Sequence, residues 1–251
     1  MVLLADEKIN NKETDVKEKS LAQYYFMQAE ELRQENKFKE SIEKYLHSIL
    51  INKNNPTSYL GLAISYKQLK NYKKAIKNLE KADKLMPLNF IIQKELALCN
   101  IVKGNYEDGI KYLMTSIRLE PDNVDMQMQL ALVHEMIEEE EMALMIYQKI
   151  IETNPDYLRA YIQKATLYMH IEDYLNSAKL FKKVIKLNPD YCRAYLALGI
   201  CYEKLGNKSG AKRFYRKYLT GTSQTENYKE ISKRIFALEV EKTSNNTLKI
   251  L

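Results

Sequence analysis

PTSYLGLAISYKQLKNYKKAIKNLEKADKLMPLN, residues 56–89, is the stretch of sequence that decides the fold. Small and aromatic residues recur along it at helical offsets, and it runs from Pro56 to just past Pro87. The prolines continue along the chain at a regular spacing. Four of them follow one another at intervals of 34 residues: Pro87, Pro121, Pro155 and Pro189. A fixed period of this length is typical of stacked helical repeats.

The offsets of these residues resemble those of the tetratricopeptide repeat family. The unit 56–89 carries Tyr59, Leu62, Ala63, Tyr66, Tyr72, Ala75, Ala82 and Pro87, and the unit 192–225 carries Tyr195, Leu198, Gly199, Tyr202, Gly206, Ala211 and Tyr215. The resemblance implies an all-α fold, a right-handed α-solenoid of six tetratricopeptide-like antiparallel helix pairs plus a C-terminal capping helix. Small residues let the paired helices approach, while large Tyr, Leu and Phe side chains fill the space alongside.

The repeat predicts the organisation of the whole chain. The solenoid covers residues 20–241, with units at about 22–55, 56–89, 90–123, 124–157, 158–191 and 192–225, and a solvated capping helix at 226–241. We expect a mobile N-terminal tail over 1–19, a first helix that starts near Ser20, and a C-terminal tail over 242–251. Each proline is predicted to open the next helix, where its missing N–H needs no partner.

Composition and motifs favour a binding protein over an enzyme. The net charge of +6 is modest for 251 residues and does not indicate a nucleic-acid-binding protein. The three cysteines, Cys99, Cys192 and Cys201, form no CxxC pair, and this pattern predicts a reducing, cytoplasmic location. No stretch approaches a membrane-spanning length. The three histidines lie on different units, and no phosphate loop or nucleophile elbow occurs. We therefore predict no catalytic residue, no metal and no cofactor.

The resemblance also implies a concave groove where the family binds peptides, lined by the fifth and ninth positions of each unit's first helix, together with the second, twelfth and thirteenth. Most of the fifth and ninth positions are apolar here, and rows of exposed apolar residues mark interaction surfaces. The alternative is that the residues pack against neighbouring helices as core. The predicted partner-binding residues are Phe26, Leu60, Ile64, Lys94, Leu98, Met128, Leu132, Met136, Ile162, Leu196 and Ile200.

We expect the partner to be an apolar or amphipathic segment of another protein, and the chain could serve as an assembly factor. The family's carboxylate clamp needs asparagines that are missing here, although Lys94, Arg159 and Arg193 could still pair with acidic groups. Of the methionines clustered in the fourth unit, Met142 and Met145 are predicted to be core residues. The run Glu138–Glu141 is predicted to be a solvated turn, and the alternative is that it binds a basic partner or, weakly, a cation.

Two further functions are alternatives. A basic patch could bind RNA or an anionic surface, although a solvated helix face is favoured because Tyr215 occupies a core position. The patch consists of Lys204, Lys208, Lys212, Arg213, Arg216 and Lys217. The other alternative is a self-assembling scaffold, in which solenoid ends or convex faces stack into homo-oligomers. Nucleic acid is the less favoured partner.

Overall fold

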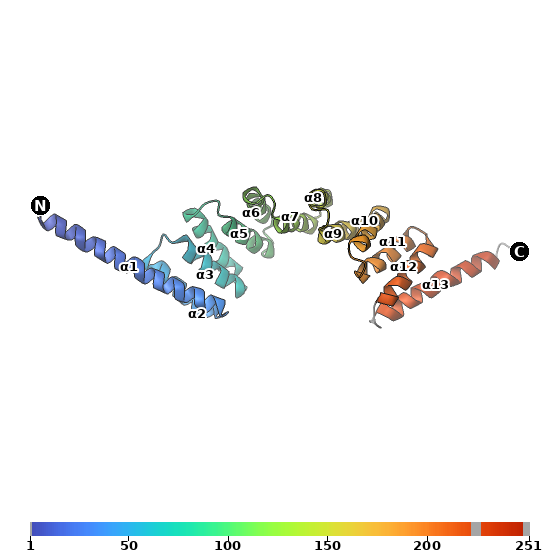
Figure 1. Cartoon of the computed structure of the whole chain (residues 1–251), viewed down its shortest axis with the longest axis horizontal. Coiled ribbons are helices and arrows are strands. Elements are labelled where there is room, and N and C mark those ends of the chain that lie inside the picture. The colour runs from blue at the N-terminus through green and yellow to red at the C-terminus, as the bar shows by residue number, and fades with distance from the viewer. Residues whose placement is uncertain (1, 222–226, 248–251) are drawn as a thin grey trace. The chain divides into compact units, whose positions relative to one another are not determined.

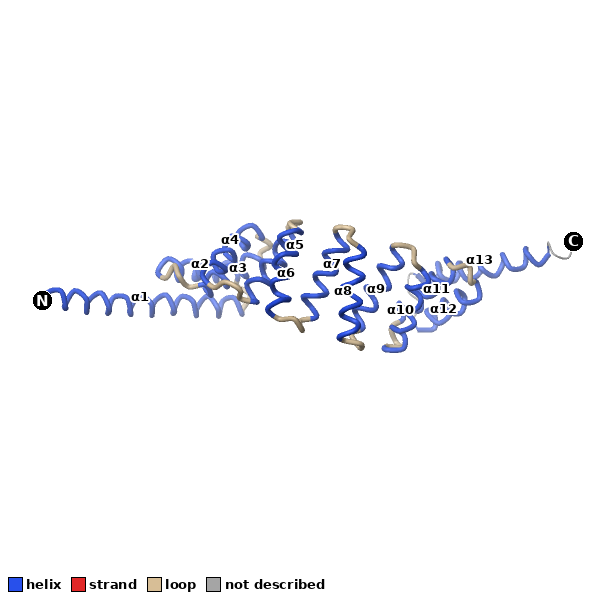
Figure 2. The backbone as a smooth tube through the Cα atoms, turned by 90° about the horizontal axis from the view of Figure 1, so that it is seen from above, coloured by secondary structure: helices blue, strands red, loops and turns tan. Residues whose placement is uncertain are grey.

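The structure, a computed structural model, describes the backbone of residues 2–221 and 227–247 and the side chains of residues 17–221 and 228–239. Over these residues the chain forms thirteen helices and no strand (Figures 1 and 2). The helices are α1 (Val2–Gln34), α2 (Phe38–Ile51), α3 (Pro56–Gln68), α4 (Tyr72–Leu85), α5 (Phe90–Val102), α6 (Tyr106–Leu119), α7 (Val124–Met136), α8 (Glu140–Thr153), α9 (Leu158–His170), α10 (Tyr174–Leu187), α11 (Cys192–Lys204), α12 (Lys208–Gly221) and α13 (Asn227–Thr247). The predicted all-α repeat fold of six helix pairs and a C-terminal helix is confirmed.

The chain divides into two compact units, Met1–Val133 and His134–Leu251. In the first unit each helix from α1 to α6 packs against the next, and α3 also contacts α1 and α5. The odd-numbered helices of this unit therefore lie side by side as one layer. In the second unit the helices from α8 to α13 pack in the same sequential way.

The turn inside each helix pair contains one residue in the left-handed backbone conformation, at the same place in every repeat. These residues lie 34 positions apart: Asn36, Lys70, Gly104, Glu138, Glu172 and Gly206, with φ between 58° and 81°. Only two of them are glycine, the residue that adopts this conformation without steric cost. The repeat therefore keeps the turn geometry even where the sequence does not favour it.

The prediction that each proline opens a helix is wrong for four of the five. Only Pro56 occupies the first turn of a helix, behind Asn55, whose side chain accepts a hydrogen bond from the Thr57 N–H at 3.1 Å. The other four prolines lie in the turns, and the helices that follow them begin at Phe90, Val124, Leu158 and Cys192. Polar turn residues cap two of the helices instead, since Asn89 and Asn123 accept hydrogen bonds from the N–H groups of Ile92 and Met126.

The two terminal helices are longer than the sequence analysis predicted. Helix α1 begins at Val2 and not near Ser20, and its N-terminal half runs beyond α2 (Figures 1 and 2). No Gly or Pro interrupts residues 2–20, which are rich in Lys and Glu, so nothing in their composition stops a helix. Helix α13 continues to Thr247, through part of the predicted C-terminal tail; residues 1 and 248–251 lie outside the described residues.

Tight contacts between aromatic rings and glycines fix how the helices pack. Tyr45 and Tyr215 are fully buried. A Cβ atom added to Gly61 would lie 2.4 Å from the Tyr45 ring, and one added to Gly199 would lie 2.3 Å from the Tyr215 ring. Both distances are far shorter than van der Waals contact, so only glycine fits at these positions. The predicted pairing of small and large residues is therefore seen directly at these two places.

Candidate partner-binding surface

The first unit presents a row of half-buried side chains on its odd-numbered helices, which we call the first-helix face. It consists of Phe26 on α1, Leu60 and Ile64 on α3, and Lys94 and Leu98 on α5. Residues four positions apart lie on the same side of a helix, so each helix contributes one stripe. Phe26 and Leu60 also pack against the buried core. The face is thus partly the edge of the core and partly open to solvent.

Charged groups flank the apolar residues of this face. Arg33 forms an ion pair with Glu30, and the Tyr45 hydroxyl donates a hydrogen bond to the same carboxylate. On α3 and α5, Lys67 Nζ lies 2.5 Å from Glu95 Oε2, and the Glu95 side chain is only 10% exposed. Such a half-buried pair persists because each charge satisfies the other. The first-helix face is therefore amphipathic, because the helices that carry its apolar side chains also carry two ion pairs.

At the end of the first unit, helix α7 departs from the sequence analysis. Met128 was predicted to line the groove, but its side chain is fully buried. Methionine is unbranched and flexible, so it fills irregular gaps in a core. Leu132, one helical turn further on, is half-buried, whereas Met136 is 56% exposed. We accordingly leave Met128 out of the candidate surface.

In the second unit the corresponding apolar residues have helical neighbours that cover them in part. Ile162 packs against the core formed by α9, α10 and α11. Leu196 and Ile200 pack against a cluster that contains Tyr218 of α12 and Ile231 of α13. For these residues the packing alternative describes what the structure contains. For Leu196 and Ile200, helix α13 contributes to this packing, since its apolar side lies in that cluster.

Three tyrosine–glutamate hydrogen bonds link the two helices of a pair, and the sequence analysis did not foresee them. Tyr45, Tyr147 and Tyr215 donate to Glu30, Glu135 and Glu203 respectively. Burial, followed by the neighbouring carboxylate, raises the pKa of all three tyrosines, and burial likewise raises the pKa of Glu135. The available signal was that these tyrosines occupy equivalent positions of three repeats.

The predicted basic patch lies on α12 and at the end of α11. Lys204, Arg213, Arg216 and Lys217 are exposed, whereas Lys208 and Lys212 are half-buried. Several of these cations already have contacts: Lys204 lies over the Tyr174 ring, Arg213 over Phe214 and Lys217 over Tyr195, at 5.9, 4.7 and 5.6 Å from the ring centroids. These rings are therefore covered by cations, which limits stacking on bases.

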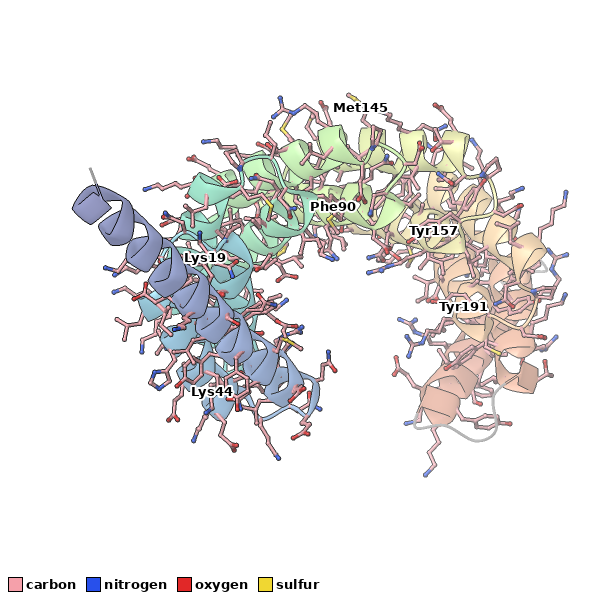
Figure 3. The ribbon with its side chains drawn as sticks, turned by 60° about the vertical axis from the view of Figure 1, so that its left-hand side comes forward. Lys19, Lys44, Phe90, Met145, Tyr157 and Tyr191 are labelled. Carbon is pink, nitrogen blue, oxygen red and sulfur yellow. The ribbon has the colours of Figure 1, made fainter. Side chains whose placement is uncertain are left out.

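Helix α8 contradicts the prediction for two methionines. Met142 and Met145 are 43% and 63% exposed, and Figure 3 shows Met145 at the outer side of the helices. The core positions of α8 are Ala143, Tyr147 and Ile150, whose spacing leaves the two methionines on the other side. Of the acidic run, Glu138 and Glu139 lie in the turn and Glu140 and Glu141 begin α8; Glu138, Glu139 and Glu141 are exposed, and His134 Nδ1 lies 2.6 Å from Glu139 Oε2.

Among the described residues, no group of three or more His, Cys, Asp and Glu side chains could hold a metal ion. Cys99 and Cys201 are buried, and burial raises the pKa of Cys99 to about 11 and also raises that of Cys201, so both thiols stay protonated at neutral pH. Within the same part of the chain, none of the helices combines the length and apolar character needed to cross a membrane.

The repeated helix pairs, the left-handed turns and the amphipathic face define a helical repeat protein. The tetratricopeptide repeat family matches residues 56–87, 158–191 and 180–213. The chain is a tetratricopeptide repeat protein. No curated protein sequence matches it significantly.

Solved structures show the same fold. A crystal structure of MamA shares 23% sequence identity over 66% of this chain and 91% of that one, with a TM-score of 0.60. YrrB, described as a tetratricopeptide repeat protein with an unusual peptide-binding site, shares 19% over 71% of this chain and 92% of that one, with a TM-score of 0.58. The C-terminal part of a repeat-containing protein from Cytophaga hutchinsonii shares 19% over 78% of each chain, with a TM-score of 0.72.

Proposed function

We propose that the chain is a protein-interaction scaffold, without enzymatic activity of its own, that binds an amphipathic helical segment of a partner protein on the first-helix face. The observation that carries the proposal is that the half-buried Ile64 and Leu98 share one helix layer with the Arg33–Glu30 and Lys67–Glu95 ion pairs. An apolar centre with a charged border is the usual anatomy of a protein interface. The family, and the peptide-binding site named for YrrB, support this choice.

The chemistry of the face favours one kind of segment over others. An entirely apolar segment would bury the ion pairs without replacing their contacts with water, which costs free energy. An amphipathic helix instead places apolar side chains on Ile64 and Leu98 while its polar side chains reach the charged border. Lys94, which lies 5.8 Å from the centroid of the Phe90 ring, adds a cation at the edge. A partner helix with an acidic side chain beside its apolar stripe fits this edge.

The proposal is tested by selecting helical peptides against the whole protein and measuring their affinity for variants. Ile64→Glu and Leu98→Glu place a charge in the centre of the face, so we expect at least a tenfold loss of affinity, about 1.4 kcal/mol or more. The matched control is Leu46→Glu, because Leu46 is an apolar side chain of α2 that is 47% exposed and lies outside the face.

Circular dichroism and thermal unfolding establish that each variant keeps its fold. Peptides that bind Ile64→Glu and Leu98→Glu as tightly as the unaltered protein contradict the proposal. Peptides that lose affinity only for the Leu46→Glu control place the binding surface on the second helices of the pairs, and they contradict it as well.

A further inference from the structure

The first end of the helical array, at α1 and α2, carries an acidic hollow that we call the acidic end. Gln28, Glu31, Leu32 and Glu35 of α1 line it, together with Glu40, Glu43 and Lys44 of α2. Glu35 forms an ion pair with Lys37 at 2.8 Å, and Lys44 lies over the Tyr25 ring. Among the described residues, Glu31, Glu40 and Glu43 make no ion pair. Three carboxylates therefore face solvent beside one another.

Exposed apolar side chains continue this surface along α1. Leu21 and Tyr24 are 46% and 55% exposed, and Gln28 donates a hydrogen bond to the Tyr24 hydroxyl at 2.7 Å. Leu21, Tyr24, Gln28, Glu31 and Glu35 follow one another at alternating intervals of three and four residues. This is the spacing of a stripe along which a second helix can pack. The acidic end thus combines a contact stripe with negative charge.

The last helix of the chain presents the opposite chemistry on its outer side, which we call the basic end. Ile231 and Leu238 of α13 are buried, so the opposite side of that helix faces solvent. This side carries Lys229 and Lys233, both exposed, and Phe236, which is 67% exposed. Neither lysine makes an ion pair with a described residue. The three side chains lie at intervals of four and three residues and form a second stripe.

We propose that the basic end of one molecule docks on the acidic end of a second copy of this chain. Lys229 and Lys233 pair with carboxylates of the acidic hollow, and Phe236 packs against Leu21 and Tyr24. The proposal commits to a second copy because each surface supplies what the other lacks, both in charge and in exposed apolar area. It is independent of the first-helix face and goes beyond the proposed binding of a partner helix.

The geometry of such a contact determines what assembles. Different surfaces of the two copies meet, so the contact is heterologous, and a docked pair still has one free acidic end and one free basic end. Repeated docking therefore adds further copies, as open chains or as closed rings. One helix against one hollow is a small interface, below about 1,200 Å² of total buried surface, so the association is weak and depends on concentration.

The test is the solution mass of the full chain, measured by sedimentation at protein concentrations from about 10 µM to about 1 mM. We expect the average mass to rise with concentration at low ionic strength and to fall back toward the monomer in about 0.5 M salt, which screens the charges. Two charge-reversed proteins, Glu31→Lys with Glu43→Lys and Lys229→Glu with Lys233→Glu, are each expected to stay monomeric. The matched control, Lys73→Glu with Lys77→Glu on α4, should associate like the unaltered protein.

Mixing the two charge-reversed proteins keeps the proposal falsifiable even if one variant is less stable. The first retains a working basic end and the second a working acidic end, and the two reversed ends are again opposite in charge, so an equimolar mixture is expected to recover association that neither protein shows alone. Three results overturn the proposal: a monomer at every concentration, association that survives either charge reversal, or a mixture that stays monomeric. A monomer that binds phosphatidylserine vesicles through Lys229 and Lys233 assigns the basic end to a membrane instead.

Discussion

The first-helix face of the first unit and the equivalent positions of the second unit carry similar apolar residues in different surroundings. Beside Ile64 and Leu98 stand the Arg33–Glu30 and Lys67–Glu95 ion pairs. Leu196 and Ile200 instead pack against the cluster that includes Ile231 of the terminal helix α13. One repeat pattern therefore yields an amphipathic face in one unit and a face joined to the terminal helix in the other. Neighbouring residues, and not the repeat itself, decide which.

The largest expected effect comes from loosening α13. Ile231 is only 3% exposed, so Ile231→Ala should lower the free energy of unfolding by about 2–4 kcal/mol, through lost burial and a residual cavity. Ile64→Ala on the half-buried first-helix face should cost about 1 kcal/mol, because less apolar area leaves contact. Urea unfolding of both variants measures the difference. An equal loss in the free energy of unfolding for the two variants contradicts the difference in packing between α13 and the first-helix face.

The two ring–glycine contacts provide the next comparison, with one in each unit. Gly61→Ala and Gly199→Ala each force a methyl group into the space of a buried tyrosine ring, at 2.4 and 2.3 Å respectively. We expect each to destabilise the fold by about 1–3 kcal/mol, as overpacking does. Thermal unfolding of the two variants provides the values. A variant as stable as the unaltered protein shows that its ring moves aside freely.

Alkaline pH should weaken the tyrosine–glutamate links in both units. Burial, then the Glu203 hydrogen bond, raises the pKa of Tyr215 above its ordinary value of 10.0. The folded state therefore holds this proton more tightly than the unfolded chain. Its stabilisation is complete below about pH 10 and is lost as the pH rises above that value, by up to about 1.4 kcal/mol per pH unit for each tyrosine.

Free energies of unfolding at about pH 8 and pH 11 test this link. Tyr215→Phe should show a smaller decrease between the two values than the unaltered protein, because one titrating group is gone. Tyr45→Phe is the matched variant in the first unit, where Arg33 donates a hydrogen bond to the Tyr45 hydroxyl at 3.2 Å and lowers its pKa in part. A pH dependence unchanged in both variants argues against the assigned protonation.

The smallest effects are expected in the turns. Lys70 holds φ at 58°, a conformation that costs a residue with a Cβ about 1 kcal/mol relative to glycine, so Lys70→Gly should stabilise the first unit by up to that amount. Gly206, with φ at 72°, provides the reverse experiment in the second unit, because Gly206→Ala should destabilise it by a similar amount. Chemical unfolding should show that Lys70→Gly raises the free energy of unfolding and Gly206→Ala lowers it. Changes of the same sign in both variants contradict the assigned cost of the left-handed conformation.

The fold could be predicted because the repeat restates the same information in several places. The 34-residue interval of Pro87, Pro121, Pro155 and Pro189 indicated the helix pairs, although the prolines themselves lie in turns and do not start the helices. The long α1 was missed because a charged composition suits both a tail and an exposed helix. Local sequence does not separate these two outcomes.

The candidate surface could be predicted only in part. Offsets within the repeat place Leu60, Ile64 and Leu98 on one side of their helices, where the structure has them half-buried, whereas the burial of Met128 and the exposure of Met145 depend on which side of α7 and α8 meets a neighbouring helix. The Lys67–Glu95 ion pair joins residues of different repeats, so no local sequence pattern predicts it. Contacts between repeats are the information that a single sequence lacks.

The most direct test of the central claim is a methyl NMR titration of the full chain, with labelled isoleucine side chains, against a selected amphipathic peptide. Ile64 and Ile200 occupy the same position of different repeats, so they report on the two surroundings in one spectrum. We expect the Ile64 methyl signal to shift on binding while that of Ile200 stays in place. A peptide that shifts Ile200 and leaves Ile64 unchanged contradicts the central claim.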